Sequence, residues 1–242
     1  MMNLTKPEGF VKPEANCLAS YILEMLTAID VNKLKQSFEH LPKDPYLQGN
    51  YRFRRLSHFK VIDPSHSANE AARLIKLPHR RLFQSKQYNP LLGDVIREYD
   101  ELDDKLIQLE DFQRLIWEFF QFCKLCSTSN EIGVHQIRTI ATSEELGNPA
   151  PEGIHRDGVD VVGIFSVDRN GIGGGETHLY KHKDDQHPAF SKVLNPGEFL
   201  VFRDDQYFHY TSPVNTINTD QGTRDVFVLT CPGLFPPEEG QM

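Results

Sequence analysis

The pattern of hydrophobic and polar positions changes near residue 131. From there to residue 232, short runs of β-branched and aromatic residues are separated by Gly, Pro, Asn and Asp. This pattern predicts a series of short strands, which is typical of a β-sandwich or a jelly roll. The predicted strands are residues 134–142, 159–167, 176–182, 190–194, 198–203, 207–214 and 224–231.

Helical patterns are confined to the earlier part of the chain. Residues 14–39 carry apolar side chains at helical spacing, and residues 94–126 form the longest helical pattern. We expect the second pattern to break near residues 103–104 or 110–111. Residues 1–13 are polar, contain two prolines and are expected to form a loose arm.

Two further segments predict strands before the jelly roll. Residues 51–62 alternate in polarity, which favours a strand with one cationic face, and residues 79–85 favour a second strand. The predicted fold class is therefore mainly β with flanking helices, as in a double-stranded β-helix (a cupin-like jelly roll). We expect one domain over residues 1–242, with helical support and N-terminal strands over about 1–127 and core strands over about 131–232.

Net charge limits the classes of partner. The chain has 26 Lys and Arg against 34 Asp and Glu, a formal net charge of −8. This balance disfavours general binding to nucleic acids or anionic membranes, so local basic clusters are expected to bind small anions. No apolar stretch reaches the roughly 18 residues of a membrane helix, and no signal-peptide pattern is present, so a cytoplasmic protein is expected.

Two motifs are interpreted as structural. The single CxxC at Cys123 and Cys126 lies at an apolar helix end without a second pair, which favours packing over a metal or redox role. The glycine run 171–175 lacks the GK[ST] of a phosphate loop and favours a hairpin connection before a strand that starts at Glu176.

His155, Asp157 and His209 form the strongest candidate for chemistry. His155 and Asp157 are two positions apart, so on an extended segment their side chains share one face. His209 lies 54 residues later in a strand-like run. Two histidines and one carboxylate on one face match the facial triad of non-haem Fe(II) oxygenases, which leaves open positions on the metal. A zinc site can use the same residue types and stays an alternative.

Arg224 is a second candidate. It opens the run RDVFVLTC, 15 residues past His209. If the two runs 207–214 and 224–231 pair antiparallel, Arg224 returns to the neighbourhood of the metal. An arginine there is a bidentate receptor for a carboxylate, whereas a lone arginine elsewhere is more often part of a surface ion pair.

These blocks together resemble a known family. PEGIHRDGVD (151–160), GGETHLY (174–180), FRDDQYFHYTSPV (202–214) and RDVFVLTC (224–231) are similar, in the same order, to the iron- and 2-oxoglutarate-dependent dioxygenases that hydroxylate free aliphatic amino acids. Within this family, the sequence resembles the bacterial L-isoleucine dioxygenases. YRFRRLSHF and HQIR, near residues 51–59 and 135–138, are similar to its earlier blocks.

The resemblance implies a concrete activity. It implies that His155, Asp157 and His209 hold Fe(II) and that Arg224 binds the distal carboxylate of 2-oxoglutarate. With O₂, the co-substrate would become succinate and CO₂ while an aliphatic C–H of a free L-amino acid, of the isoleucine, leucine or methionine kind, is hydroxylated. Many relatives carry a hydroxyl residue two positions after this arginine, but here that position is Val226, so the second anchor of the carboxylate is open.

A free amino acid also needs a cation, an anion and an apolar pocket. Two other functions stay open on the same scaffold, namely a protein or peptide hydroxylase and a non-catalytic jelly-roll binding domain. The oligomeric state is not predicted. The candidate substrate-binding residues are Arg54, Gln136, Arg138, Arg156, Asp160 and Thr177, and Arg52 and Arg55 are further candidate cations.

Overall fold

The computed structural model describes residues 20–63 and 73–235, and antiparallel β-sheet dominates them. The major sheet has seven strands, and every pair of neighbours in it is antiparallel. Its strands, in spatial order, are β1 (Tyr21–Met25), β9 (Glu198–Arg203), β5 (Val161–Asn170), β12 (Gln221–Cys231), β4 (Glu131–Thr142), β2 (Arg52–Ile62) and β3 (Arg73–Lys76).

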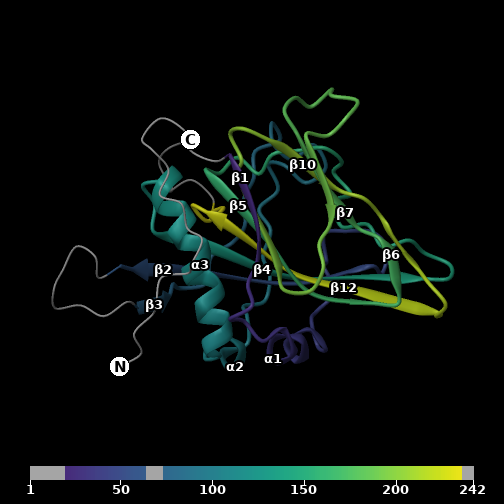
Figure 1. The fold of residues 1–242 in the computed structure, drawn as a ribbon, viewed down its shortest axis with the longest axis horizontal. Coiled ribbons are helices and arrows are strands. Elements are labelled where there is room, and N and C mark those ends of the chain that lie inside the picture. The colour runs from purple at the N-terminus through teal and green to yellow at the C-terminus, as the bar shows by residue number, and fades with distance from the viewer. Residues whose placement is uncertain (1–19, 64–72, 236–242) are drawn as a thin grey trace.

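Shorter strands form the opposing layer. A three-stranded sheet contains β10 (Phe208–Thr211), β7 (Glu176–Tyr180) and β8 (Phe190–Val193), and a two-stranded sheet pairs β11 (Val214–Thr216) with β6 (Ile172–Gly174). Figure 1 shows β7 and β10 on one side of the major sheet and the helices on the other. The molecule is therefore a double-stranded β-helix, or jelly roll, with flanking helices.

Helices cover one face of the major sheet. They are α1 (Val31–Lys35), the 3₁₀ turn η1 (Gln36–Phe38), α2 (Asp104–Ile107) and α3 (Glu110–Cys126). Asp30 caps α1 and Asp103 caps α2, each by accepting a hydrogen bond from a backbone N–H two residues later. Within the ranges that the structure describes, no helix is both long and apolar enough to cross a bilayer.

Alternation along the strands divides the core into two clusters. Side chains at successive strand positions point to opposite faces. On β12, Phe227 and Leu229 pack with the helices, whereas Val226 and Val228 face the opposing layer of shorter strands. We call these the helix face and the cavity face. The register of the sheet thereby decides which polar side chains can reach a ligand.

Most predicted strands are confirmed. The seven runs after residue 131 contain or overlap β4, β5, β7, β8, β9, β10 and β12, and residues 52–62 form β2. The glycine run forms the short strand β6 before β7 starts at Glu176. Cys123 is fully buried and Cys126 packs against the same cluster, which confirms their packing role.

Three predictions are wrong, at least in part. Within the predicted helix 14–39, residues 21–25 form the strand β1, because they pair with β9, and only residues 31–35 are α-helical. Residues 79–85 form no strand, although Leu82 makes one isolated bridge. The helical pattern 94–126 is helical only from residue 104. The predicted arm at residues 1–13 lies outside the described residues.

Candidate active site

Two main-chain hydrogen bonds join the first candidate ligand to the third. The His155 N–H donates to the carbonyl oxygen of His209 over 3.1 Å, and the His209 N–H donates back to His155 over 2.8 Å. This isolated antiparallel bridge connects the loop before β5 to β10. Residues 54 positions apart in the sequence are thereby held side by side.

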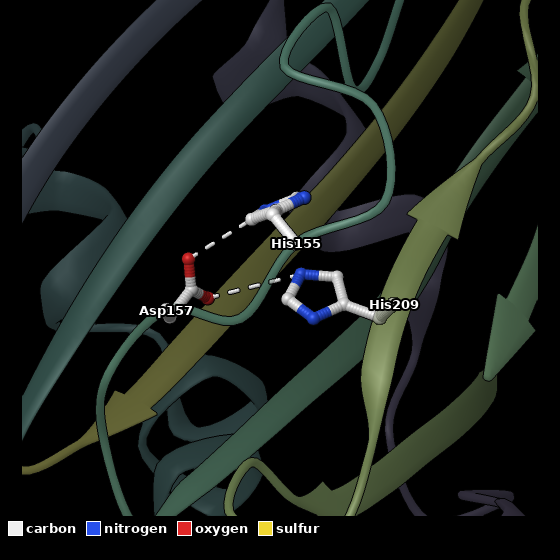
Figure 2. A group of neighbouring side chains, drawn as sticks. All are labelled: His155, Asp157 and His209. Carbon is white, nitrogen blue, oxygen red and sulfur yellow. Dashed lines mark ion pairs between the residues drawn. The ribbon is translucent and has the colours of Figure 1, made fainter. Parts of the chain in front are cut away.

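Asp157 completes a cluster with both histidines (Figure 2). Its carboxylate oxygens lie 3.7 Å from His155 Nε2 and 3.9 Å from His209 Nε2. One ligand atom from each residue lies within 4.8 Å of the other two. The predicted convergence of these three side chains is therefore present in the structure.

Neighbouring groups orient the cluster. His155 Nδ1 lies 2.9 Å from the carbonyl oxygen of Gly153, so a proton on Nδ1 leaves Nε2 free as a ligand. The side-chain amide of Gln84 donates to Asp157 Oδ1 over 2.8 Å. Such hydrogen bonds from outside the cluster fix ring and carboxylate orientation, which a metal site requires.

A second buried carboxylate supports the loop. Asp204 accepts backbone N–H groups of Asp157, Gly158 and Val159 over 2.7 to 3.2 Å. Gly158 has φ of +83°, a backbone conformation that favours glycine. Asp204 thus holds the turn after the HxD motif in the shape that aims Asp157 at the histidines.

The electrostatics of the cluster favour a bound cation. Burial, and then the charge of Asp157, raise the pKa of Asp204 to about 7. Burial opposes the charged form of His155, but Glu152 and Asp157 outweigh it and raise the His155 pKa. Burial and the neighbouring His155 lower the pKa of His209 well below its usual value, which keeps it in the neutral form that binds metals.

Arg224 lines the same cavity as the cluster. The condition considered for Arg224, that residues 207–214 pair with residues 224–231, is not met, because β10 pairs with β7 while β12 pairs with β4 and β5. Arg224 still reaches the cavity, since the two sheets face each other. Arg224 is 4% exposed and has no carboxylate partner among the described residues. Burial lowers the pKa of its guanidinium to about 10.

The cavity combines this charge with apolar walls. Aliphatic side chains from β4, β5 and β12 line it, together with Leu234 from the segment after β12.

The family model for the 2OG-Fe dioxygenases matches residues 35–230, which include the whole cluster and Arg224. The chain belongs to the 2OG-Fe dioxygenase family. Its members use Fe(II), 2-oxoglutarate and O₂, so this dioxygenase is an enzyme of that type.

The names of two curated relatives of this dioxygenase state that they act on isoleucine or on a hydroxylated isoleucine. The 3(1)-hydroxy-L-isoleucine 4-dioxygenase of Pantoea ananatis (strain AJ13355) is 27% identical over 211 residues, which are 83% of this chain and 80% of that protein. The L-isoleucine-4-hydroxylase of Bacillus thuringiensis is 27% identical over 153 residues, which are 61% of this chain and 63% of that protein.

A solved structure shares the fold. The crystal structure of a bsmA homolog from Methylobium petroleophilum PM1 is 28% identical, covers 90% of both chains and gives a TM-score of 0.73. The similarity thus extends over most of the residues that build the two sheets and the cavity.

The cluster fits the iron of the family. Two imidazoles and one carboxylate are the donor set of the non-haem Fe(II) oxygenases, and three ligands leave room for a co-substrate and O₂. His209 Nδ1 is buried without a hydrogen-bond partner, and its nearest carboxylate oxygen, on Asp204, is 3.9 Å away. Orientation of His209 therefore comes from its backbone bridge and from a ligand at Nε2.

The candidate substrate residues divide between the two faces of the sheet. Arg54 lies on the cavity face of β2 and lines the cavity. Gln136 and Arg138 point to the helix face of β4, where Gln136 donates to Ser37 and Arg138 pairs with Asp225. The structure therefore places Gln136 and Arg138 away from the cavity.

The remaining candidates, Arg156, Asp160 and Thr177, do not line the cavity. Thr177 is fully buried, and its hydroxyl is 3.2 Å from the hydroxyl of Thr211, which does line the cavity. The guanidinium of Arg156 stacks on Phe208 at 4.2 Å from the ring centroid. Asp160 accepts a hydrogen bond from Ser127 and is exposed.

Sequence reasoning missed several residues of the cavity. Glu152 lies 3.3 Å from His155 Nε2, and its position in PEGIHRD was the available signal. Gln84 and Arg97 come from a segment that is irregular in the structure, and the strand and helix that the sequence predicted there did not indicate that either residue reaches the cavity. His135, buried beside Arg54, sits in a strand that the sequence did predict.

Proposed function

We propose that this dioxygenase hydroxylates an aliphatic C–H of a free L-amino acid of the isoleucine, leucine or methionine kind. In the same turnover 2-oxoglutarate is converted to succinate and CO₂. One observation carries the proposal. The His155, Asp157 and His209 cluster shares a single cavity with an apolar wall and with a buried arginine that has no carboxylate partner in the described ranges.

The three ligand residues are assigned to the metal. Iron bound there supplies the oxidising chemistry that links decarboxylation of the co-substrate to hydroxylation of the substrate. The chain itself keeps the ligands in place. The Gly153 carbonyl keeps Nε2 of His155 directed at the metal position, and Gln84 prevents rotation of the Asp157 carboxylate.

Arg224 is assigned to the distal carboxylate of 2-oxoglutarate. A guanidinium that is buried without an anion is costly, and a dicarboxylate bound beside the metal removes this cost. Val226 and Val228 follow Arg224 on the same face and exclude water from the co-substrate. Thr211 contributes a hydroxyl to the cavity lining and is a candidate for the second anchor of this carboxylate.

The substrate class follows from the rest of the cavity. Ile137, Ile164 and Leu234 offer an apolar surface to an aliphatic side chain, and Glu152 offers a carboxylate to an ammonium group. The two curated relatives carry isoleucine or hydroxyisoleucine in their names. No comparable observation favours a protein hydroxylase or a non-catalytic binding domain.

The test is a screen of the Fe(II)-loaded protein against the free amino acids. We expect succinate release that depends on 2-oxoglutarate and on one or a few aliphatic amino acids, with a product that gains one oxygen atom by mass spectrometry. Release with peptides but with no free amino acid would support the hydroxylase of proteins instead. A protein that binds neither iron nor 2-oxoglutarate would support a binding domain. The single domain over 1–242 and the cytoplasmic location stay predictions.

A further inference from the structure

Two more buried arginines line the cavity beside the metal cluster. Arg54 on β2 is 8% exposed, and Arg97 in the segment before α2 is 1% exposed. Neither forms an ion pair with a carboxylate in the described part of the chain, and Nε of each is buried without a hydrogen-bond partner. Arg52, which lines the same cavity, differs because it pairs with Asp44 at 3.0 Å.

Neutral groups hold both guanidiniums in place. Arg54 stacks on the ring of Tyr99 at 4.5 Å and donates from Nη2 to His135 Nδ1. Arg97 donates from Nη2 to Gln84 Oε1 over 2.7 Å. Burial, and then the charge of Arg54, keep the pKa of His135 well below its usual value, so this imidazole adds no charge. The pair is thus oriented but uncompensated, which is how a receptor for an anion is built.

The position of the pair points to the substrate. Gln84 accepts from Arg97 and donates to Asp157, so one side chain separates the guanidinium from a metal ligand. Arg224 approaches the cavity from a different strand and serves the co-substrate in the assignment above. An anion on Arg54 and Arg97 would belong to a second molecule held beside the iron.

We propose that Arg54 and Arg97 form the receptor for the carboxylate of the substrate. This inference rests on the proposed function and makes it specific, because it requires a carboxylate on any good substrate. Gln84 is then a positioning residue that sets the distance between the bound carboxylate and Asp157. Bidentate contacts from two guanidiniums fix the orientation of the amino acid, so that its aliphatic side chain extends toward the apolar wall.

Binding to the Fe(II)- and 2-oxoglutarate-loaded protein without oxygen tests the receptor. The probes are L-isoleucine, L-isoleucinamide, which lacks the carboxylate, and 3-methylpentanoate, which lacks the ammonium group. By calorimetry we expect L-isoleucine to bind at least about 30-fold more tightly than L-isoleucinamide. Equal affinity for these two probes overturns the receptor, and this arm needs no substitution.

Variants locate the contact. Arg97→Met and Arg54→Met should each lower the affinity for L-isoleucine about 30-fold or more. The affinity of both variants for 2-oxoglutarate should stay near that of the unchanged protein. The matched control is Arg81→Met, which removes the same charge from an exposed position of the same segment. The proposed receptor is wrong if Arg97→Met and Arg54→Met lower the affinity for 2-oxoglutarate instead. It is also wrong if they bind L-isoleucine as tightly as the control does.

Failure of the receptor and failure of the proposed function give different results. If 3-methylpentanoate and other carboxylates bind in an Arg97-dependent manner but no free amino acid binds, the receptor stands and the proposed substrate class is wrong. If free amino acids bind and are hydroxylated regardless of Arg54 and Arg97, the function stands and the receptor is wrong. Arg97→Lys and Arg54→Lys keep the charge, so they report on the contact geometry should a methionine variant fail to fold.

Discussion

Arginine side chains on the two faces of the major sheet differ in whether a carboxylate of the fold pairs with them. On the helix face, Arg138 of β4 donates two hydrogen bonds of 2.7 Å to Asp225 of the neighbouring strand. On the cavity face, Arg54 and Arg224 lie on strands of the same sheet and have no carboxylate partner among the described residues. Arg138 thus has its counter-ion within the fold, whereas Arg54 and Arg224 are placed to bind the carboxylate of a ligand. Arg52 lies on the same face as Arg54 but pairs with Asp44.

This difference shows how a structural charge is told from a functional one. Residue type does not separate the two kinds, because Arg138, Arg54 and Arg224 all lie on strands of one sheet. Pairing does, because a buried charge without its counter-ion lowers stability unless a ligand supplies the missing partner. Substitutions can break the ion pair on one face and the ligand contacts on the other.

The largest effect is expected at the metal cluster. Asp157→Ala removes the carboxylate ligand, so succinate release and product formation should fall below detection. Metal content and circular dichroism of the variant separate loss of iron from loss of fold. Asp205→Ala, an exposed carboxylate in the turn before β10, is the matched control. Activity of Asp157→Ala at the level of this control would remove Asp157 from the iron site.

Breaking the pair on the helix face should destabilise the fold. Arg138→Met leaves Asp225 buried and unpaired, and Asp225 is fully buried. We expect the free energy of unfolding in urea to fall by about 3–5 kcal/mol, with little change in the KM for 2-oxoglutarate.

A double variant sharpens this result. Replacing both partners, as in Arg138→Met with Asp225→Leu, removes the unpaired charge and should recover part of the lost stability. A single variant with unchanged stability and a raised KM would place Arg138 in ligand binding instead.

Removing the Arg224 guanidinium from the cavity face should weaken the binding of 2-oxoglutarate. Arg224→Met takes the charged partner away from the distal carboxylate of 2-oxoglutarate, so its KM should rise by about 30-fold or more, equivalent to roughly 2–5 kcal/mol. Stability without ligands should not fall, because no carboxylate loses a partner. Unchanged affinity for 2-oxoglutarate would contradict the assignment of Arg224.

A smaller effect is expected from His58, a polar group on the cavity side of β2. Its Nε2 is buried without a hydrogen-bond partner, and burial followed by the charge of Arg80 lowers its pKa to about 4. Between that value and the unfolded pKa of about 6.5, the unfolded chain binds more protons, so stability falls as the pH falls.

Unfolding in urea at pH 7.5 and pH 5 measures this contribution. The His58 share of the loss at pH 5 should be about 2 kcal/mol, and the variant His58→Gln should lack it. Other titrating groups, including Asp204 with its opposite sign, cancel in the difference between the two proteins. Parallel pH dependence of both proteins would show that His58 is not the group responsible.

The sequence predicts the β-roll because alternation and turn residues are local signals. It fails at residues 21–25, where apolar spacing also matches a helix and only pairing with β9 decides for a strand. It fails again at residues 79–103, whose irregular course depends on contacts such as the bridge between Leu82 and Arg97. Long-range pairing, which no local pattern records, decides both cases.

The site shows the same division. His155, Asp157 and His209 are marked by residue type and spacing, and Arg224 by its place in a recognisable block. Arg97 carries no such mark, because its segment is irregular and long-range contacts bring it into the cavity. Arg138 was a candidate cation for the substrate, but the register of β4 against β12 places its side chain on the helix face.

The main-chain bridge between His155 and His209 has a consequence for repair of the metal centre. Two amide hydrogen bonds set the separation of these residues, and neither depends on an imidazole ring. We therefore expect the variant His155→Gly to keep the main-chain position of residue 155 and to leave a cavity of the size of the imidazole ring. Free imidazole from solution should bind in this cavity. The spacing belongs to the peptide scaffold, and the rings are exchangeable attachments to it.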